Sequence, residues 1–177
     1  MARQSNKPAA NIVSGLAGML DRDLRALRRE VEAYPDDQSL WREIPGMPNV
    51  GGTLVLHLTG NLQHYMGAQL GRSGYVRNRP AEFTRRNVPR AELLREIEAA
   101  RAAVQSGLAV VSSEALAADY PEVIAGSRVA TGDYLVHLAS HFAYHLGQLD
   151  YHRRAVTGEN RGVDAMRPNE LSSARPV

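Results

Sequence analysis

Apolar side chains recur three and four residues apart along this chain, which is the spacing of one face of an α-helix. The first stretch of this kind carries Leu16, Leu20, Leu24, Leu27 and Val31. The pattern predicts helices at about residues 10–33, 49–70, 90–111 and 131–156. No stretch shows the convincing alternation of a β-strand. The predicted fold class is therefore all-α, a four-helix bundle whose helices bury their apolar stripes against one another.

Residues that start or stop helices set the expected limits of these segments. Pro35 ends the first helix, because proline lacks the N–H group that a helix interior requires. Asn49 and Thr131 are the predicted N-caps of the second and fourth helices, since their side-chain oxygens can accept from free backbone N–H groups. Gly71 and Gly158 are the expected ends of the same two helices.

Two long connections separate the predicted helices. The connection 72–89 is too long for a tight turn between antiparallel neighbours, so we expect it to cross the end of the bundle. Residues 112–131 are irregular, with a short hairpin expected between 123–124 and 128–129. Residues 1–10 and 159–177 are polar and contain proline. We expect them to form a flexible N-terminal tail and a C-terminal tail around one bundle domain, 11–158.

The composition excludes several classes of function. The chain has 177 residues and no cysteine, which excludes thiolate zinc sites, iron–sulfur clusters and cysteine nucleophiles. Any metal ligands must therefore be His, Asp or Glu. The net charge is only +2, with 21 basic and 19 acidic residues, which is not the field of a nucleic-acid-binding protein. Arg22, Arg25, Arg28 and Arg29 alternate with acidic residues, and this alternation predicts a solvated helix face.

No apolar run approaches the ~20 residues that a membrane-spanning helix needs. Residues 1–10 lack the apolar core of a secretory signal. The missing cysteines agree with a reducing compartment. We therefore expect a cytoplasmic protein that binds neither a membrane nor nucleic acid.

All six histidines lie on the second and fourth predicted helices. On the fourth, His141 and His145 are one turn apart and border the apolar stripe, so both imidazoles can reach one cation. His137 has the same spacing from His141 but turns toward solvent. His152 points inward and lies farther along the helix.

His57 is the best third ligand, because it shares the apolar face of the second helix while His64 lies off that face. Three neutral imidazoles with an open fourth position are typical of a catalytic zinc-type site. Asn61 and Gln148 are placed to orient ligands or substrate. The same spacings also fit histidines that only hydrogen-bond in the core or at an interface. The helical pattern alone leaves both interpretations open.

Four short stretches give the chain a family resemblance. His57-Leu-Thr-Gly-Asn61 and His141-Phe-Ala-Tyr-His145-Leu-Gly-Gln148-Leu resemble the DinB/YfiT-like superfamily of metal-binding four-helix bundles. Arg77-Asn-Arg79-Pro-Ala-Glu82-Phe83 and Asp150-Tyr-His-Arg-Arg154 are similar to one of its uncharacterised subgroups. The resemblance runs from about Leu16 to Arg154, which is most of the chain.

The resemblance implies an up-down-down-up bundle, often a homodimer, with a divalent zinc or nickel ion on His57, His141 and His145. Some relatives transfer low-molecular-weight thiols, such as bacillithiol or mycothiol, to electrophiles. Others isomerise maleylpyruvate with a thiol cofactor. Because this chain has no cysteine, a thiol cosubstrate would have to be a small molecule supplied from outside.

Two functions of different classes remain open on the sequence. The first is a metal-dependent enzyme that activates an exogenous thiol or water for S-transfer or hydrolysis on a small-molecule substrate. In that enzyme Glu82 would be a general base or a ligand-binding residue and Arg79 a clamp for an anionic group, unless they only anchor the loop through a salt bridge. The second is a non-catalytic dimeric bundle, a stress or ligand-binding protein whose ion ties the second helix to the fourth.

Overall fold

The computed structural model describes residues 12–171 and 173–175. Its long helices are α1 (Ile12–Glu32), α2 (Gly51–Leu62), α4 (Arg90–Ala109) and α6 (Thr131–Thr157). Shorter elements are a π-helical segment that continues α2 (Gln63–Leu70), α3 (Arg79–Thr84), α5 (Ser113–Ala117) and 3-10 turns at Ser39–Trp41 and Pro168–Glu170. The predicted all-helical four-helix bundle is confirmed. None of the described helices is both long enough and apolar enough to cross a membrane.

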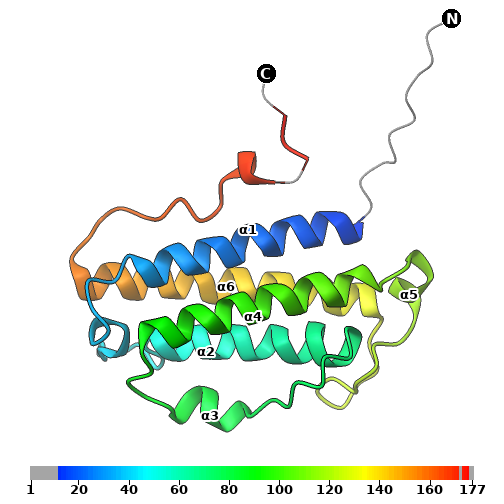
Figure 1. The fold of residues 1–177 in the computed structure, drawn as a ribbon, viewed down its shortest axis with the longest axis horizontal. Coiled ribbons are helices and arrows are strands. Elements are labelled where there is room, and N and C mark those ends of the chain that lie inside the picture. The colour runs from blue at the N-terminus through cyan, green and yellow to red at the C-terminus, as the bar shows by residue number, and fades with distance from the viewer. Residues whose placement is uncertain (1–11, 172, 176–177) are drawn as a thin grey trace, which may run out of the picture.

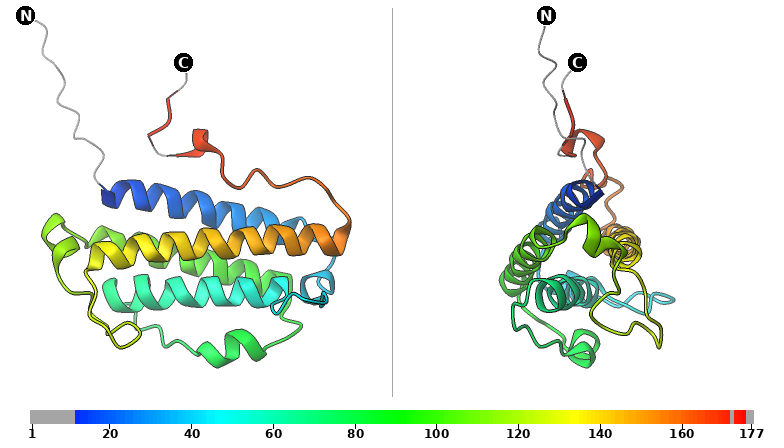
Figure 2. Two further views of the ribbon diagram at one scale, coloured as in Figure 1. Left: turned by 180° about the vertical axis from the view of Figure 1, so that it is seen from behind. Right: turned by 90° about the vertical axis from the view of Figure 1, so that its right-hand side faces the viewer.

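The long helices pack in a ring of neighbours. α1 packs against α4 and α6, and α2 packs against the same two helices, as the end-on view in Figure 2 shows. α1 and α6 run in one direction, and α2 and α4 run in the other (Figure 1). The Arg153–Glu30 ion pair, which joins the ends of α6 and α1, agrees with these directions. The helices therefore run up, down, down and up along the chain.

Leucines fill the space between the helices. The apolar stripe that the sequence predicted for the first helix is buried at every position: Leu16, Leu20, Leu24, Leu27 and Val31. Residues of α4 and α6 join the same core, among them Leu93, Ile97, Leu135 and Phe142. Burial of one such side chain contributes about 1.5–3 kcal/mol. The predicted stripes are thus the faces that hold the bundle together.

The two predicted N-caps are each wrong by one residue. α2 begins at Gly51 with Val50 at the N-cap, so Asn49 lies outside the helix. α6 begins at Thr131 itself, which leaves this residue inside the first turn. Its hydroxyl donates to the carbonyl of Ala118 and so ties the preceding connection to the helix.

The predicted helix ends are confirmed at Gly71 and Gly158. Gly158 adopts a φ of 74°, the left-handed conformation that glycine tolerates best. α1 ends at Glu32, shortly before Pro35. The predicted start of the first helix near residue 10 and the expected tail 1–10 lie outside the described residues.

The connection 72–89 does not cross the end of the bundle, contrary to our expectation. Because α2 and α4 run in the same direction, the chain has to return over the length of α2, and it does so along the outer side of that helix (Figure 1). α3 forms on this return path, where the side chain of Asn78 accepts a hydrogen bond from the N–H of Ala81 and Pro80 occupies the first turn. The connection therefore lays a short additional helix against α2.

Residues 112–130 contain α5, which the sequence did not predict and whose start is capped by the side chain of Ser112. The expected hairpin is reduced to a tight reversal, in which Ile124 and Ser127 exchange backbone hydrogen bonds of 2.9 and 2.8 Å. Ala125 and Gly126 form its tip, and both have positive φ. The connection thus contains one short helix and one tight turn.

The prediction of a solvated arginine-rich face on α1 is wrong for Arg22, which is buried, whereas Arg25, Arg28 and Arg29 stay partly exposed. Arg22, Asp23 and Glu30 are 5%, 1% and 0% exposed. The segment that follows α6 runs back over α1 (Figure 1), and Arg29 donates to its backbone at the carbonyl of Val163. Alternating charges fit a covered, paired helix face as well as a solvated one. Here the residues that cover part of α1 belong to the segment after α6, which is distant in the sequence.

Gly107 allows α4 to approach the π-helical segment closely. A Cβ atom on Gly107 would lie 2.3 Å from the carbonyl oxygen of Met66, a backbone atom. We expect Gly107→Ala to lower the free energy of unfolding by about 1–3 kcal/mol, measured by urea denaturation. The control is Gly15→Ala, because a Cβ there meets nothing within 4 Å and should be neutral or stabilising. Equal stability of the two variants would contradict the close approach.

Candidate metal centre

Three histidines meet between α2 and α6. His57 from α2 and His141 and His145 from α6 offer one ring nitrogen each, and these three atoms lie within 4.8 Å of one another. Nε2 of His57 is 3.3 Å from Nε2 of His141. His57 is buried, and the other two are half-buried. The structure thus brings together the three residues that the sequence singled out as metal ligands.

A carboxylate fixes the ring of His57. Nδ1 of His57 lies 2.9 Å from Oε2 of Glu82. A carboxylate only accepts, so Nδ1 carries the proton and Nε2 keeps its lone pair for the centre. Arg77 in turn holds Glu82 with two hydrogen bonds of 2.6 and 2.8 Å. A histidine oriented in this way by a carboxylate is the usual arrangement behind a metal ligand.

The local sequence explains how Glu82 reaches this position. Asn78 caps α3, and the helix then presents Glu82 toward α2. Gly60 leaves the necessary room on α2, since a Cβ atom there would lie 2.5 Å from Oε1 of Glu82. Phe83, the next residue, packs its ring 5.0 Å from the His57 ring. α3 therefore supports His57 with the carboxylate of Glu82 and the ring of Phe83.

His145 is oriented by its own helix. Its Nδ1 donates to Oε1 of Gln148, three residues later, over 2.6 Å. This hydrogen bond leaves Nε2 of His145 free to point at the centre, as in His57. The two rings are perpendicular, with centroids 5.2 Å apart.

Burial and mutual repulsion keep the imidazoles of α6 neutral. Burial, followed by the nearby His145 and His57, lowers the pKa of His141 to about 4. Burial also lowers the pKa of His145, against the opposing effect of Gln148. For Glu82, burial would raise the pKa, but the hydrogen bonds from His57 and Arg77 outweigh it and hold the pKa below its usual range. At neutral pH His141 and His145 therefore present unprotonated nitrogens, and the supporting carboxylate of Glu82 is ionised.

The donor set and its spacing fit a zinc- or nickel-type ion. Imidazole nitrogens suit zinc, nickel and copper better than magnesium or calcium. Two nitrogens at the ~2.0–2.1 Å typical of zinc, on a tetrahedron, are about 3.3 Å apart. The Nε2 atoms of His57 and His141 have this separation, at 3.3 Å. Three protein ligands leave a fourth position for water or a substrate.

The three histidines form part of the wall of a cleft of about 440 Å³ that is open to solvent. The other lining residues are Asn61, Tyr65, Arg77, Arg79, Phe83, Ile124, Ala125, Tyr134 and His137. Ile124 and Ala125 belong to the tight reversal in the connection 112–130. The open face of the centre is thus bordered by α2, α6, the return connection and this turn.

The remaining predicted site residues divide into two groups. Asn61 and Arg79 line the cleft, with the guanidinium of Arg79 lying 5.1 Å from the centre of the Phe83 ring. Glu82 and Gln148 do not line it and lie behind the ligands His57 and His145. The first group is placed to contact a substrate, and the second to orient ligands.

Sequence reasoning missed Arg77, the partner of Glu82. Residues 77–83 contain both Arg77 and Arg79, and the sequence offers no signal that decides which of them pairs with the carboxylate of Glu82. Tyr65 and Tyr134 also border the cleft. Their rings are 5.1 Å apart and perpendicular.

The three other histidines have partners of their own. His137 stacks on Tyr134 at the margin of the cleft and is exposed. His64 pairs with Glu122 over 2.8 Å. His152 is 1% exposed, and both of its ring nitrogens are satisfied within the core.

Comparison with protein families gives one clear match. A family model described as the DinB superfamily matches residues 19–149, well over half of the chain. The chain belongs to the DinB superfamily. The match includes all three histidines, Asn61 and Glu82, and the resemblance seen in the sequence is confirmed. Neither the curated proteins nor the solved structures contain a significant match to this DinB-superfamily chain.

His57→Ala removes one ligand of the candidate centre in this DinB-superfamily chain. We expect the unmodified protein to bind about one zinc or nickel ion per chain and the variant to lose stoichiometric binding. Elemental analysis after dialysis measures the occupancy. The control is His137→Ala, which removes a histidine one turn from His141 that is outside the ligand group. Full metal occupancy in His57→Ala would refute the assignment.

Glu82→Gln tests the carboxylate that orients His57. We expect metal affinity to fall about 10- to 100-fold, because the ligand loses its charged partner while keeping a residue of similar shape. Competition with a chromophoric chelator measures this change, and urea denaturation shows whether the variant is folded. Glu92→Gln is the control, since Glu92 pairs with Arg85 away from the cleft. Unchanged affinity would mean that Glu82 only anchors the loop.

Proposed function

We propose that this chain is a metal-dependent enzyme of the DinB type, which uses a divalent ion on His57, His141 and His145 to activate an exogenous thiol or water for S-transfer or hydrolysis. One observation carries the proposal. Three imidazole nitrogens converge at the wall of an open cleft, and the grouping contains no fourth protein ligand among the described residues. Such a site keeps a coordination position for a reactant.

A bound zinc-type ion supplies one kind of chemistry here, which is to bring the pKa of coordinated water or thiol toward neutrality. The chain's own residues hold this site in shape. Glu82 and Arg77 fix the tautomer of His57, and Gln148 fixes that of His145. Because both oxygens of Glu82 are engaged with His57 and Arg77, we assign it a positioning role instead of that of a general base.

The sulfur of a thiol reaction would come from a small cosubstrate, because the chain contains no cysteine. Asn61 lies one turn after His57 on α2 and lines the cleft, so we assign it a substrate contact. Arg79 borders the same cleft and is the residue placed to bind a charged cosubstrate. We also propose a homodimer, on the family resemblance, which light scattering would test.

A non-catalytic role has one observation in its favour. The histidines come from two helices, so an ion would also link α2 to α6 and stabilise the bundle. If that were its whole role, loading the ion would raise the melting temperature while the cleft stayed inert toward thiols. The two functions therefore differ in a measurable way.

We expect the zinc- or nickel-loaded protein to accelerate the consumption of monobromobimane by a low-molecular-weight thiol. A chelator and His57→Ala should each abolish the acceleration, because both remove the ion. Glu92→Gln should leave the rate unchanged. A fully loaded protein that accelerates neither this reaction nor the hydrolysis of an activated ester would favour the non-catalytic bundle.

A further inference from the structure

The charged groups that line the cleft are all of one sign. Its wall contains Arg77 and Arg79 and, among the described residues, no Asp or Glu. Glu82 lies behind His57 and neutralises Arg77 through two hydrogen bonds. The positive charge left over at the cleft is therefore that of Arg79, to which a bound divalent ion would add.

Arg79 is held in place without being neutralised. Within residues 12–171 and 173–175 it forms no ion pair and no hydrogen bond, and the carbon of its guanidinium lies 5.1 Å from the centre of the Phe83 ring. Phe83 in turn packs against the ring of His57. The ring of Phe83 thus contacts both the guanidinium of Arg79 and the candidate metal ligand His57. All N–H donors of Arg79 remain available.

Asn61 is a second unpaired polar group at the same cleft. It is 8% exposed, yet its amide has no hydrogen-bond partner in the described part of the chain. Its amide atoms are not among the fully buried ones, so in the open cleft water is the partner that they can reach. The amide has two N–H donors, and an acceptor group brought by a ligand can replace that water.

The aromatic rings of the cleft do not favour a cationic ligand instead. The face of Tyr65 already carries Arg77, whose guanidinium carbon is 5.5 Å from the ring centre. The face of Tyr134 is stacked on His137, with an interplanar angle of 14°. Apart from the histidine nitrogens assigned to the metal ion, the wall therefore offers an organic cation no carboxylate, and these two aromatic rings already contact Arg77 and His137.

We propose that the cleft selects small molecules that carry a carboxylate, which receives hydrogen bonds from Arg79 and Asn61. Arginine matches a carboxylate with two parallel N–H donors, and the amide of Asn61 adds a third. The inference rests on the proposed function, because it places the thiol of the same molecule, or the bond that water would cleave in it, at the histidine end of the cleft. It goes further in naming the charge and the chemical group that the ligand must carry.

Three thiols of similar size test this selection. Titration of the cobalt-loaded protein with 3-mercaptopropionate, 2-mercaptoethanol and cysteamine gives each dissociation constant from the sulfur-to-cobalt charge-transfer band. We expect 3-mercaptopropionate to bind about 10-fold or more tightly than 2-mercaptoethanol, and cysteamine to bind most weakly. Thiol acidity works against this order, since 3-mercaptopropionate is the least acidic of the three.

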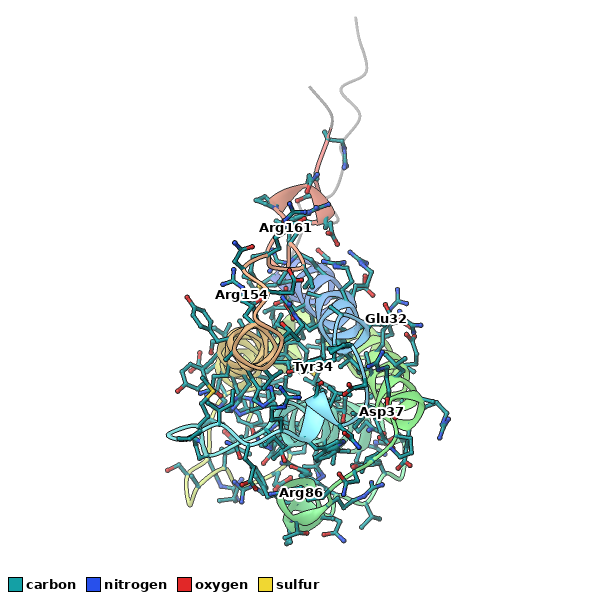
Figure 3. The ribbon with its side chains drawn as sticks, turned by 90° about the vertical axis from the view of Figure 1, so that its left-hand side faces the viewer. Glu32, Tyr34, Asp37, Arg86, Arg154 and Arg161 are labelled. Atoms are coloured by element: carbon teal, nitrogen blue, oxygen red, sulfur yellow. The ribbon has the colours of Figure 1, made fainter. Side chains whose placement is uncertain are left out.

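Arg79→Gln should reduce the preference for 3-mercaptopropionate to about twofold or less while leaving the affinity for 2-mercaptoethanol unchanged. Asn61→Leu should weaken 3-mercaptopropionate binding in the same direction. The matched control is Arg86→Gln. Arg86 is exposed, lies beside α3 on the side of the bundle opposite α1 (Figure 3), and does not line this cleft. It should keep the full preference.

The outcomes separate this inference from the proposed function. Equal affinities for the three thiols, or tighter binding of cysteamine, would overturn carboxylate selection while leaving the metal site intact. If cobalt binds but no thiol produces the charge-transfer band, the thiol form of the proposed function fails. Calorimetry with succinate and with neutral succinamide then decides the selection alone: preferential succinate binding that Arg79→Gln removes supports it, and its absence refutes it.

Discussion

The hydrogen bond between His57 and Glu82 is the interaction on which the site depends. It decides which nitrogen of the ring carries the proton, and hence which one faces His141 and His145. It also ties α3, on the return connection, to the middle of α2. Burying the carboxylate would be costly alone, but Arg77 holds both of its oxygens and so offsets that cost. The interaction therefore both orients the candidate ligand His57 and holds α3 against α2.

The helix directions explain why this support exists. In a simple up-down bundle, α2 would pass into its neighbour by a short turn. Here α2 and α4 are parallel, so a connection of helix length must run back along the outer side of α2 (Figure 1). That connection brings Arg77, Arg79, Glu82 and Phe83 to the back and the margin of the centre. The topology therefore supplies a second layer of residues that a tight turn could not.

The sequence predicted those features of the molecule that depend on the residues of a single helix. Periodicity identified the four helices, and the angle between positions on a helix selected His57, His141 and His145. It failed where the answer depends on a partner distant in the chain. Arg22 appeared solvated because its cover comes from the segment after α6, and Arg77 went unnoticed because nothing local assigns it to Glu82. The caps at Asn49 and Thr131 failed for a related reason, since a cap depends on where the preceding connection enters the helix.

Comparison of His152 with His57 resolves the ambiguity that helical spacing leaves. Both are buried on inward faces, so sequence position alone gives them the same interpretation. The ring of His152 accepts a hydrogen bond from Tyr34, which lies in the interior among α1, α2 and α6 (Figure 3), and its other nitrogen donates to the carbonyl of Arg42. No lone pair remains for a cation, and His152 is a core residue. Nδ1 of His57 is bound to Glu82, but its Nε2 contacts only another imidazole, Nε2 of His141 at 3.3 Å, beside His145. What separates a ligand from a core histidine is therefore whether the second ring nitrogen is bound to another kind of group or faces further imidazoles, and this depends on tertiary contacts.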